Sequence, residues 1–355
     1  MRACGVISST STKWLVCGIV NLTVCLVADF CATASAQSSP TNIFAPASEP
    51  AHSLVGLSLF VLAVCAAIFL VVFSLLVYCL FKFRRKPSDD GREPPQIYGS
   101  NPIELAWTVM PVLIVVVLFL ASVRVIKAVQ DAEPPADAIE VTAIAHQFWW
   151  EFRYPKIGVV TANELHVPVA NSSSPASTFI RLLSADTDHS FWVPRLAGKT
   201  DLIPNHPNRM WIAPSETGVY LGQCAQYCGT QHAKMLLRVY VDSPEQFREW
   251  SERQTRPADV NSAVSEGRHI FEMNACVNCH TVTDTTNPRD SKFGPDLTHL
   301  MSRDTIAAGA APNTPENLRR WIENPDSLKP GSLMPAMGLA PHEIEALVAY
   351  LETLR

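Results

Sequence analysis

The chain has 355 residues, of which 48% are hydrophobic and 17% are charged, and its formal net charge is −5 at pH 7. This length allows two or three domains. The hydrophobic residues are concentrated in the first 130 positions, whereas the rest of the chain carries more acidic than basic side chains. An acidic chain of this kind is not expected to bind nucleic acid, although its charge would attract a basic soluble protein.

The first segment, residues 1–36, predicts a secretory signal peptide. Arg2 and Lys13 precede an apolar run over residues 14–27, and the sequence Ala-Ser-Ala at 34–36 supplies the small residues of a cleavage point. The alternative is a third membrane helix, but polar residues interrupt the run. We therefore expect export of the chain, with cleavage near position 36.

Residues 37–130 predict a transmembrane hairpin. Two nearly uncharged runs, at about 54–81 and 103–122, are each long enough to cross a bilayer, which takes about 20 residues. The loop between the runs is rich in Lys and Arg and is therefore expected on the cytoplasmic side. Buried core helices are the alternative, but two runs of this length with basic flanks favour membrane spans. Everything after the hairpin would then lie outside the cytoplasm.

Residues 131–242 predict a β-barrel or β-sandwich. Short runs rich in Val, Ile and aromatic residues alternate there with Asn, Ser, Pro and Gly. Metal ligands in such folds usually come from loops at one end, because the rigid strands hold those loops in place.

One cluster in this segment has the donors of a copper site. Cys224, Cys228, His232 and Met235 lie close together, and His189 lies upstream of them. Thiolate, imidazole and thioether groups are soft or borderline ligands that suit copper. Two bridging cysteines can hold two copper ions, each completed by one histidine and one weak ligand. The alternative is a Cys2His2 zinc site, against which Met235 and the exported location both weigh.

Residues 243–261 are expected to form a linker, and residues 262–355 an all-α haem domain. The sequence Cys276-x-x-Cys279-His280 is typical of haem c attachment: the two thiols bind the haem covalently and the histidine ligates the iron. The alternative is a redox or zinc Cys-x-x-Cys, for which the adjacent histidine would be a coincidence.

Two later segments of this domain resemble small class I cytochromes c. In Phe-Gly-Pro-Asp-Leu at 293–297, the resemblance implies that the carbonyl of Pro295 orients the ligating histidine. Gly-Ser-Leu-Met-Pro at 331–335 resembles the distal loop, which implies that Met334 is the second axial ligand. Met337 is the rival, but the ligand of the family directly precedes a proline. A methionine opposite a histidine raises the haem potential.

The hairpin, Asp186-x-x-His189-Ser190 and Cys-x-x-x-Cys-x-x-x-His-x-x-Met together resemble subunit II of haem–copper cytochrome c oxidases, over about residues 50–242. The resemblance implies a cupredoxin-like Greek-key β-barrel with a dinuclear copper A centre. The implied copper ligands are His189, Cys224, the backbone carbonyl of Gln226, Cys228, His232 and Met235. Many members have a glutamate at position 226 that also helps to hold magnesium at the subunit I boundary. An amide is a weaker ligand for this hard cation, so the sequence leaves magnesium open.

Two further roles are implied by the resemblance alone. The family receives electrons through an aromatic patch, to which Phe148, Trp149 and Trp150 correspond; the alternative for these side chains is core packing. The family also has a glutamate at the mouth of a proton path into subunit I, to which Glu104 corresponds. The alternative for Glu104 is an acid that is favourable at a helix N-terminus.

The whole arrangement resembles the caa3-type oxidases, in which a cytochrome c is joined to subunit II. It implies electron transfer from haem c to copper A and on to the haems and copper B of subunit I, coupled to proton translocation. The implied partners are subunits I and III and an upstream cytochrome c or quinol–cytochrome c reductase. The implied location is a bacterial cytoplasmic membrane, with both metal domains on the periplasmic side. The alternatives are the copper A subunit of a nitric oxide reductase and a non-enzymatic, membrane-tethered electron shuttle.

Overall fold

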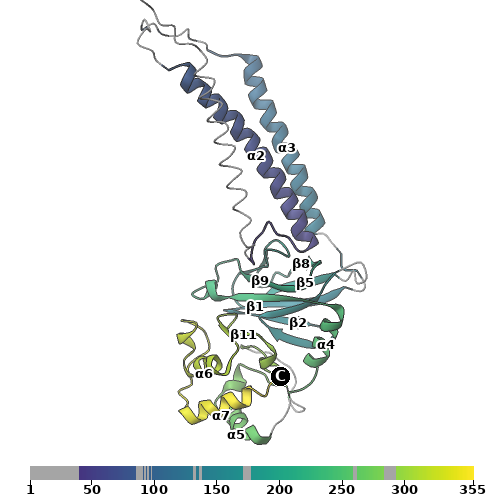
Figure 1. Ribbon diagram of the computed structural model, residues 1–355, viewed down its shortest axis with the longest axis vertical. Helices are drawn as coiled ribbons and strands as arrows, with labels where there is room; N and C mark the ends of the chain where they lie inside the picture. Colours follow the sequence, from purple (N-terminus) through teal and green to yellow (C-terminus); the bar gives the residue numbers. More distant parts are fainter. Residues whose placement is uncertain are drawn as a thin grey trace, which may run out of the picture.

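The computed structural model describes residues 40–84, 98–130, 133–135, 138–170, 177–258, 262–283 and 293–355, together with residues 91, 93 and 96. The predicted signal peptide lies outside the described residues. Three parts follow one another along the chain and along the long axis of the molecule in Figure 1: a helical hairpin, a two-sheet barrel and a helical domain. The barrel therefore separates the hairpin from the C-terminal domain.

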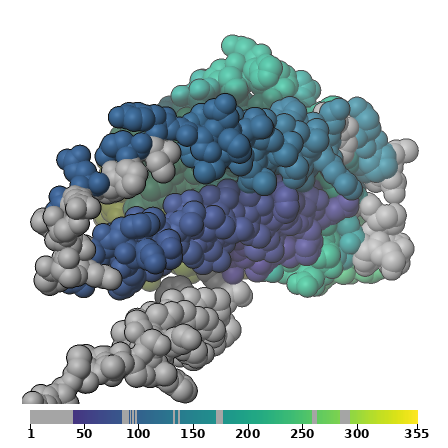
Figure 2. Space-filling model, turned by 90° about the horizontal axis from the view of Figure 1, so that it is seen from above, coloured from purple at the N-terminus to yellow at the C-terminus, as the bar shows by residue number. Residues whose placement is uncertain are grey.

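The hairpin consists of two long helices, α2 (Glu49–Lys82) and α3 (Asn101–Gln130), which lie side by side (Figures 1 and 2). Both are long and apolar enough to cross a membrane. The most apolar stretch of each helix is not buried against other described residues. The helices are longer than the predicted spans because each continues beyond its apolar stretch into polar turns. Water does not stabilise such an apolar surface, so it indicates contact with lipid or with other membrane helices.

The barrel is built from two five-stranded sheets. The first sheet contains, in spatial order, β3 (Val159–Ala162), β2 (Trp149–Tyr154), β1 (Ile139–His146), β5 (Thr178–Ser184) and β8 (Asn208–Ile212). The second contains β4 (Glu164–Pro168), β10 (Leu236–Asp242), β9 (Gly218–Cys224), β6 (His189–Trp192) and β7 (Thr200–Leu202). The pairs β1–β5 and β4–β10 are parallel and the other neighbours are antiparallel. This arrangement confirms the predicted cupredoxin-like barrel.

Aromatic side chains join the two sheets next to the start of β6. Trp150 and Phe152 of β2 both meet Phe191 of β6 edge-to-face, with ring centroids 5.5 and 6.4 Å apart. All three side chains are fully buried. Because such contacts fix both the distance and the tilt of the packed rings, β6 and its first residue, His189, are held firmly on the first sheet.

The structure differs from the predicted linker over the first part of residues 243–261. α4 (Pro244–Gln254) is a helix that packs on the barrel, where Phe247 and Trp250 lie against Tyr154 at ring centroid distances of 6.4 and 5.3 Å. Ser243 caps this helix and forms a reciprocal pair of hydrogen bonds with Gln246. This capping box and the apolar face are typical of a helix, whereas the prolines and charges of the same segment favoured a linker. The connection between the domains therefore begins only after Gln254.

The C-terminal domain is mainly helical, as predicted. Its main helices are α5 (Ser265–Met273), α6 (Pro315–Glu323) and α7 (Pro341–Leu351). Short turns and a two-stranded ribbon complete it: η2 (Ser262–Val264), η3 (Cys276–Asn278), η4 (Leu300–Ser302), β11 (Thr305–Ile306), β12 (Ala311–Pro312) and η5 (Pro325–Ser327). The terminal helix crosses the first helix at Gly267, where a Cβ atom would lie only 2.0 Å from the carbonyl oxygen of Ala346. Only glycine permits this approach, and the crossing confirms the predicted packing of the last helix on the first.

Candidate metal centres

The donors of the predicted copper cluster meet at one end of the barrel. His189 begins β6 and Cys224 ends β9, and these strands are antiparallel neighbours in which Phe191 pairs with Cys224. The loop after Cys224 passes through η1 (His232–Lys234) and returns to Met235, just before β10. The Cys224 N–H donates to the Met235 carbonyl at 2.9 Å, which closes the loop at its base. Residues 224–235 are called the copper loop below.

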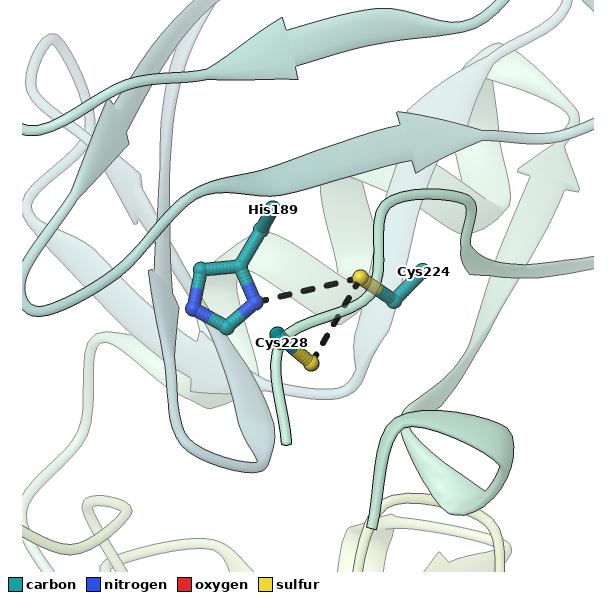
Figure 3. A group of neighbouring side chains, drawn as sticks. All are labelled: His189, Cys224 and Cys228. Atoms are coloured by element: carbon teal, nitrogen blue, oxygen red, sulfur yellow. Dashed lines mark hydrogen bonds between the residues drawn. The ribbon is translucent and has the colours of Figure 1, made fainter. Parts of the chain in front are cut away.

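Each cysteine sulfur lies near one imidazole nitrogen and one weaker donor. The distances are 3.8 Å from Cys224 Sγ to His189 Nδ1, 3.1 Å from Cys224 Sγ to the Gln226 carbonyl oxygen, 3.8 Å from Cys228 Sγ to His232 Nδ1 and 3.9 Å from Cys228 Sγ to Met235 Sδ. The two sulfurs are 3.9 Å apart (Figure 3). All six predicted donors are therefore together, as two similar halves joined by the sulfur pair.

Asp186 fixes the orientation of the His189 ring. One carboxylate oxygen lies 2.8 Å from His189 Nε2, so Nδ1 is the nitrogen that faces the sulfurs (Figure 3). The other oxygen accepts the Gln147 N–H at 2.6 Å. Burial would raise the pKa of Asp186, but the hydrogen bonds with His189 and with the N–H groups of Thr187 and Gln147 together outweigh it, and the pKa is lowered. A carboxylate behind a metal-binding histidine sets the ring's tautomer and its basicity.

The pKa values of the two buried thiols are shifted in opposite directions. The hydrogen bond from Cys228 stabilises the thiolate of Cys224 and lowers the pKa of Cys224. The same hydrogen bond holds the proton on Cys228 and raises the pKa of Cys228. The pair therefore favours the thiolate at Cys224, and a bound cation would displace the proton that Cys228 holds, because thiolate is the ligating form. This set of soft donors, with both sulfurs of the cysteines buried, fits copper.

The proximal side of the haem site is formed around His280. Its Nδ1 lies 2.8 Å from the Pro295 carbonyl oxygen, as predicted, which leaves Nε2 for the iron. Burial lowers the pKa of His280 and keeps the ring neutral, the form that ligates a metal. A Cβ atom at Gly294 would lie 2.6 Å from the His280 ring, so glycine makes room for the imidazole there. Cys276 and Cys279, on or beside η3, are half-buried free thiols, and this set fits covalent haem c.

The distal side offers both candidate methionines on one loop. Met334 is partly buried, whereas Met337 is 37% exposed. Gly331, which begins the loop, has φ of +79°, a value that favours glycine. Met334 remains the predicted axial ligand.

Three family profiles match the chain. The cytochrome c oxidase subunit II transmembrane domain matches residues 36–125, the cytochrome c oxidase subunit II periplasmic domain residues 163–241, and cytochrome c residues 264–355. A curated relative, cytochrome c oxidase subunit 2 of Alkalihalophilus pseudofirmus, is 34% identical over 82% of this chain and 84% of its own length. The chain belongs to the cytochrome c oxidase subunit II family. Its C-terminal domain is a fused cytochrome c.

A second curated relative agrees with this assignment. Cytochrome c oxidase subunit 2 of Bacillus subtilis is 30% identical over 87% of this chain and 90% of its own length. The crystal structure of the periplasmic domain of cytochrome oxidase subunit II of Bradyrhizobium japonicum is 26% identical, covers 34% of this chain and 96% of that domain, and has a TM-score of 0.32. The family implies haem c in the C-terminal domain, copper A in the barrel, membrane anchoring with an outer domain, and partnership with subunit I of a haem–copper oxidase. The nitric oxide reductase and shuttle alternatives are not favoured.

The aromatic residues predicted to receive electrons in this subunit II are all buried. Trp150 is part of the barrel core beside Phe191. For Trp150 the structure therefore shows core packing, the alternative to a role in electron entry. Phe148 and Trp149 are 7% and 8% exposed and lie under the cytochrome c domain, where Trp149 packs with Ala308. The role of Phe148 and Trp149 in electron transfer remains a prediction.

Glu104 lies in the first turn of α3, and its side chain is exposed. Its carboxylate accepts the Ser100 N–H at 3.3 Å. This is the contact expected of an acid at a helix N-terminus. The role of Glu104 at a proton path remains a prediction.

Two charged residues at the boundary between the barrel and the cytochrome c domain were not predicted from the sequence. Lys329 is 3% exposed and Glu164 is 2% exposed. Their hydrogen-bond partners are mostly backbone groups of distant segments. Any residue type supplies such groups, so no local sequence pattern reveals these contacts.

Proposed function

We propose that this subunit passes electrons from haem c in its C-terminal domain to a dinuclear copper A centre in its barrel. From there they would reach the oxygen-reducing site of subunit I, coupled to proton translocation. An upstream cytochrome c or quinol–cytochrome c reductase would supply the electrons, and subunit III would complete the complex. The location proposed is a bacterial cytoplasmic membrane, with both metal domains on the periplasmic side.

The paired geometry of the copper loop is the observation that supports a dinuclear site. Each cysteine has its own histidine Nδ1 at 3.8 Å and its own weak donor, and the two sulfurs lie 3.9 Å apart, close enough to bridge two ions. A structural zinc site uses four ligands. Zinc would leave Met235 and the carbonyl of Gln226 without a role, although both point at the sulfurs.

The role of the polypeptide in this reaction is to hold the copper ligands in fixed positions and to shield them from water. Copper A, when bound, accepts and releases one electron shared by its two metals. Strands β6 and β9 fix the backbone on either side of the site, and His189, Cys224 and Met235 are buried. Ligands that are held in place and mostly shielded from water change little between oxidation states, which keeps the barrier to transfer low.

The cytochrome c domain prepares one face of its haem in a similar way. Haem c, when bound, supplies a second one-electron carrier. The Pro295 carbonyl holds the His280 ring, and this hydrogen bond increases the basicity of the nitrogen that faces the iron. With Met334 on the other side, the domain would have the raised potential expected of an oxidase donor.

Electron paramagnetic resonance on the copper-loaded, full-length chain tests the proposal. The chain is kept fully oxidised so that the copper centre retains its unpaired electron, and the signal of low-spin ferric haem c lies at a different field. We expect hyperfine structure from one electron shared by two equivalent coppers. The variant Cys228→Ser should convert this spectrum into that of a single copper, or abolish it. A single-copper spectrum in the unaltered chain, or occupancy by zinc with no signal, would refute the dinuclear site.

A further inference from the structure

The contact between the cytochrome c domain and the barrel contains a buried ammonium group. Lys329 Nζ donates to the carbonyl oxygens of Phe148 at 2.8 Å, Lys234 at 2.9 Å and Ala307 at 3.1 Å. Two of these acceptors belong to the barrel: Phe148 is in the aromatic patch and Lys234 is on the copper loop. An ammonium group has three donors, so all three are used, and two depend on the barrel.

The same contact contains a buried carboxylate that belongs to the barrel. Glu164, the first residue of β4, accepts hydrogen bonds from the N–H of Asp304 at 3.0 Å and from the N–H and hydroxyl of Thr305, both at 2.9 Å. Arg238 of the barrel lies 3.9 Å from this carboxylate. Each domain therefore contributes one buried charge that is satisfied largely by the other domain.

Two buried charges of this kind select one docked position. Undocked, both would be hydrated; docked in a shifted position, at least one would be buried without its partners, which is costly. Their contribution is therefore to orientation more than to affinity.

Between the two charges, the backbone of the cytochrome c domain approaches the barrel very closely. Ala307, Ala308 and Gly309 have φ of +54°, +57° and +80°, values that alanine rarely adopts. The Leu236 N–H donates to the Ala308 carbonyl at 3.2 Å, and Ala308 is buried against Trp149. A Cβ atom at Gly309 would lie 3.0 Å from Leu236 Cβ. This unusual turn is shaped to the surface that it covers.

The segment that leads into the distal haem loop touches the copper loop itself. The side chain of Gln231 donates to the Pro330 carbonyl, and Lys234 Nζ donates to the Leu328 carbonyl at 3.0 Å. A Cβ atom at Gly331 would lie 3.1 Å from Thr230 Oγ1. The two redox sites are therefore joined by direct contact between their own loops.

We propose that Lys329 and Glu164 are positioning residues that seat the cytochrome c domain on the copper loop in one fixed orientation, and that the seated domain closes the Phe148–Trp149 surface to a second, diffusing electron donor. The inference rests on the proposed function, because it concerns how the electron reaches the copper. External donors would deliver electrons to the haem, and only the seated haem domain would reduce the copper.

Flash reduction of haem c in the assembled oxidase measures the step directly. In the unaltered enzyme, we expect transfer from haem c to copper at a rate that does not change when glycerol raises the viscosity. In Lys329→Met the transfer should slow by at least about tenfold, because two charge-assisted hydrogen bonds to the barrel are lost, and it should become viscosity-dependent. The control Arg319→Met removes an exposed positive charge from the same domain, which pairs with Glu345, and should match the unaltered enzyme.

A second readout does not depend on electron transfer. Hydrogen exchange should show protected amides at 304–305 in the unaltered oxidase and loss of that protection in Glu164→Gln and Lys329→Met. The haem and copper absorption spectra of both variants should stay unchanged, which shows that each domain is folded. Unaltered protection and an unaltered, viscosity-independent rate in Lys329→Met would overturn the positioning role.

Rapid mixing with a reduced soluble cytochrome c tests closure of the surface. We expect copper reduction to lag behind haem c reduction in the unaltered enzyme, and a phase of copper reduction without lag to appear in Lys329→Met. Copper reduction that precedes haem c reduction in the unaltered enzyme would refute the closure. If no electron passes from haem c to copper in the unaltered enzyme, while the amides at 304–305 are protected, the proposed function fails and the docking stands.

Discussion

The copper loop and the haem pocket differ in how much of the metal's surroundings the polypeptide itself arranges. At the copper loop, every predicted donor atom lies within 3.9 Å of a cysteine sulfur, and Cys224, Cys228 and Met235 belong to the barrel core. The side chains that bind the metal are thus also side chains that close the fold.

The haem pocket is arranged on one side only. His280 is held by Pro295 and Gly294, whereas apolar side chains near the haem-binding segments remain open to solvent: Phe293 is 81% exposed, Leu333 70% and Met337 37%. A copper ion is small, so the chain must complete its site, but a haem is as large as a cluster of side chains and can serve as core. The difference teaches that the barrel should fold without its metal and the cytochrome c domain should not.

The largest expected effect is the difference between the two domains in stability after each cofactor is removed. In Cys276→Ala/Cys279→Ala, which cannot attach haem, we expect loss of hydrogen-exchange protection throughout residues 262–355. The lost haem contacts are a large share of the roughly 5–15 kcal/mol that stabilises a domain. Extraction of copper by a chelator should leave the strands protected. Equal loss of protection in both domains after either treatment would contradict the comparison.

The second prediction concerns the distal side of the haem pocket and tests which methionine is the axial ligand. Replacement of the axial sulfur should lower the haem potential on the order of 0.1 V, since axial ligands set potentials over a range of about 0.8 V. We expect this drop in Met334→Ala and only a small change in Met337→Ala, measured by redox titration of the haem absorption. The reverse order would assign the ligand to Met337.

Asp186→Asn tests how far the copper site depends on its support. Asparagine keeps the shape of the side chain but loses the charge that holds the His189 ring, and such supports are worth about 10–100-fold in metal affinity. The measurement is competition for copper with a chelator of known affinity. Asp188→Asn, at an exposed position two residues away, is the matched control. Equal affinities in both variants would show that β6 alone orients the histidine.

The sequence was sufficient wherever one residue type does one chemical task. Cysteine, histidine and methionine at fixed spacing predicted the copper loop, and the structure brings those side chains together with Gln226. The haem attachment sequence was predicted in the same way, whereas the role of the Pro295 carbonyl was predicted only from the resemblance to class I cytochromes c. Ligand chemistry restricts these positions so strongly that the spacing alone is informative.

The sequence was insufficient where the partner is a backbone group or a distant surface. Lys329 contacts the carbonyl of Phe148, a residue 181 positions away, and any residue could offer that carbonyl. The helix α4 was missed for a different reason. Its capping box is a local signal of a helix, but its mean composition is polar, and its two aromatic residues become buried only by packing against Tyr154.

The smallest expected effect is the loss of barrel stability in acid. Glu151, 1% exposed on β2, is bonded to His146 at 3.0 Å and to Arg153. Burial would raise the pKa of Glu151, but these hydrogen bonds outweigh it and the pKa is lowered below 4.5. A carboxyl with a lowered pKa contributes stability above about pH 4.5, and the contribution is lost as the pH falls through the lowered value.

Glu151→Gln should therefore destabilise the barrel by about 1 kcal/mol at pH 7, the usual net effect of a buried hydrogen bond, and by less at pH 3. Urea unfolding of the copper-free, haem-containing chain, followed by tryptophan fluorescence at both pH values, measures this difference. Glu140→Gln removes a half-exposed carboxylate that pairs with Lys156 at 3.1 Å and should cost less than about 1 kcal/mol at either pH. A constant loss in Glu151→Gln from pH 7 to pH 3 would mean that packing of this side chain, not its charge, stabilises the barrel next to the copper loop.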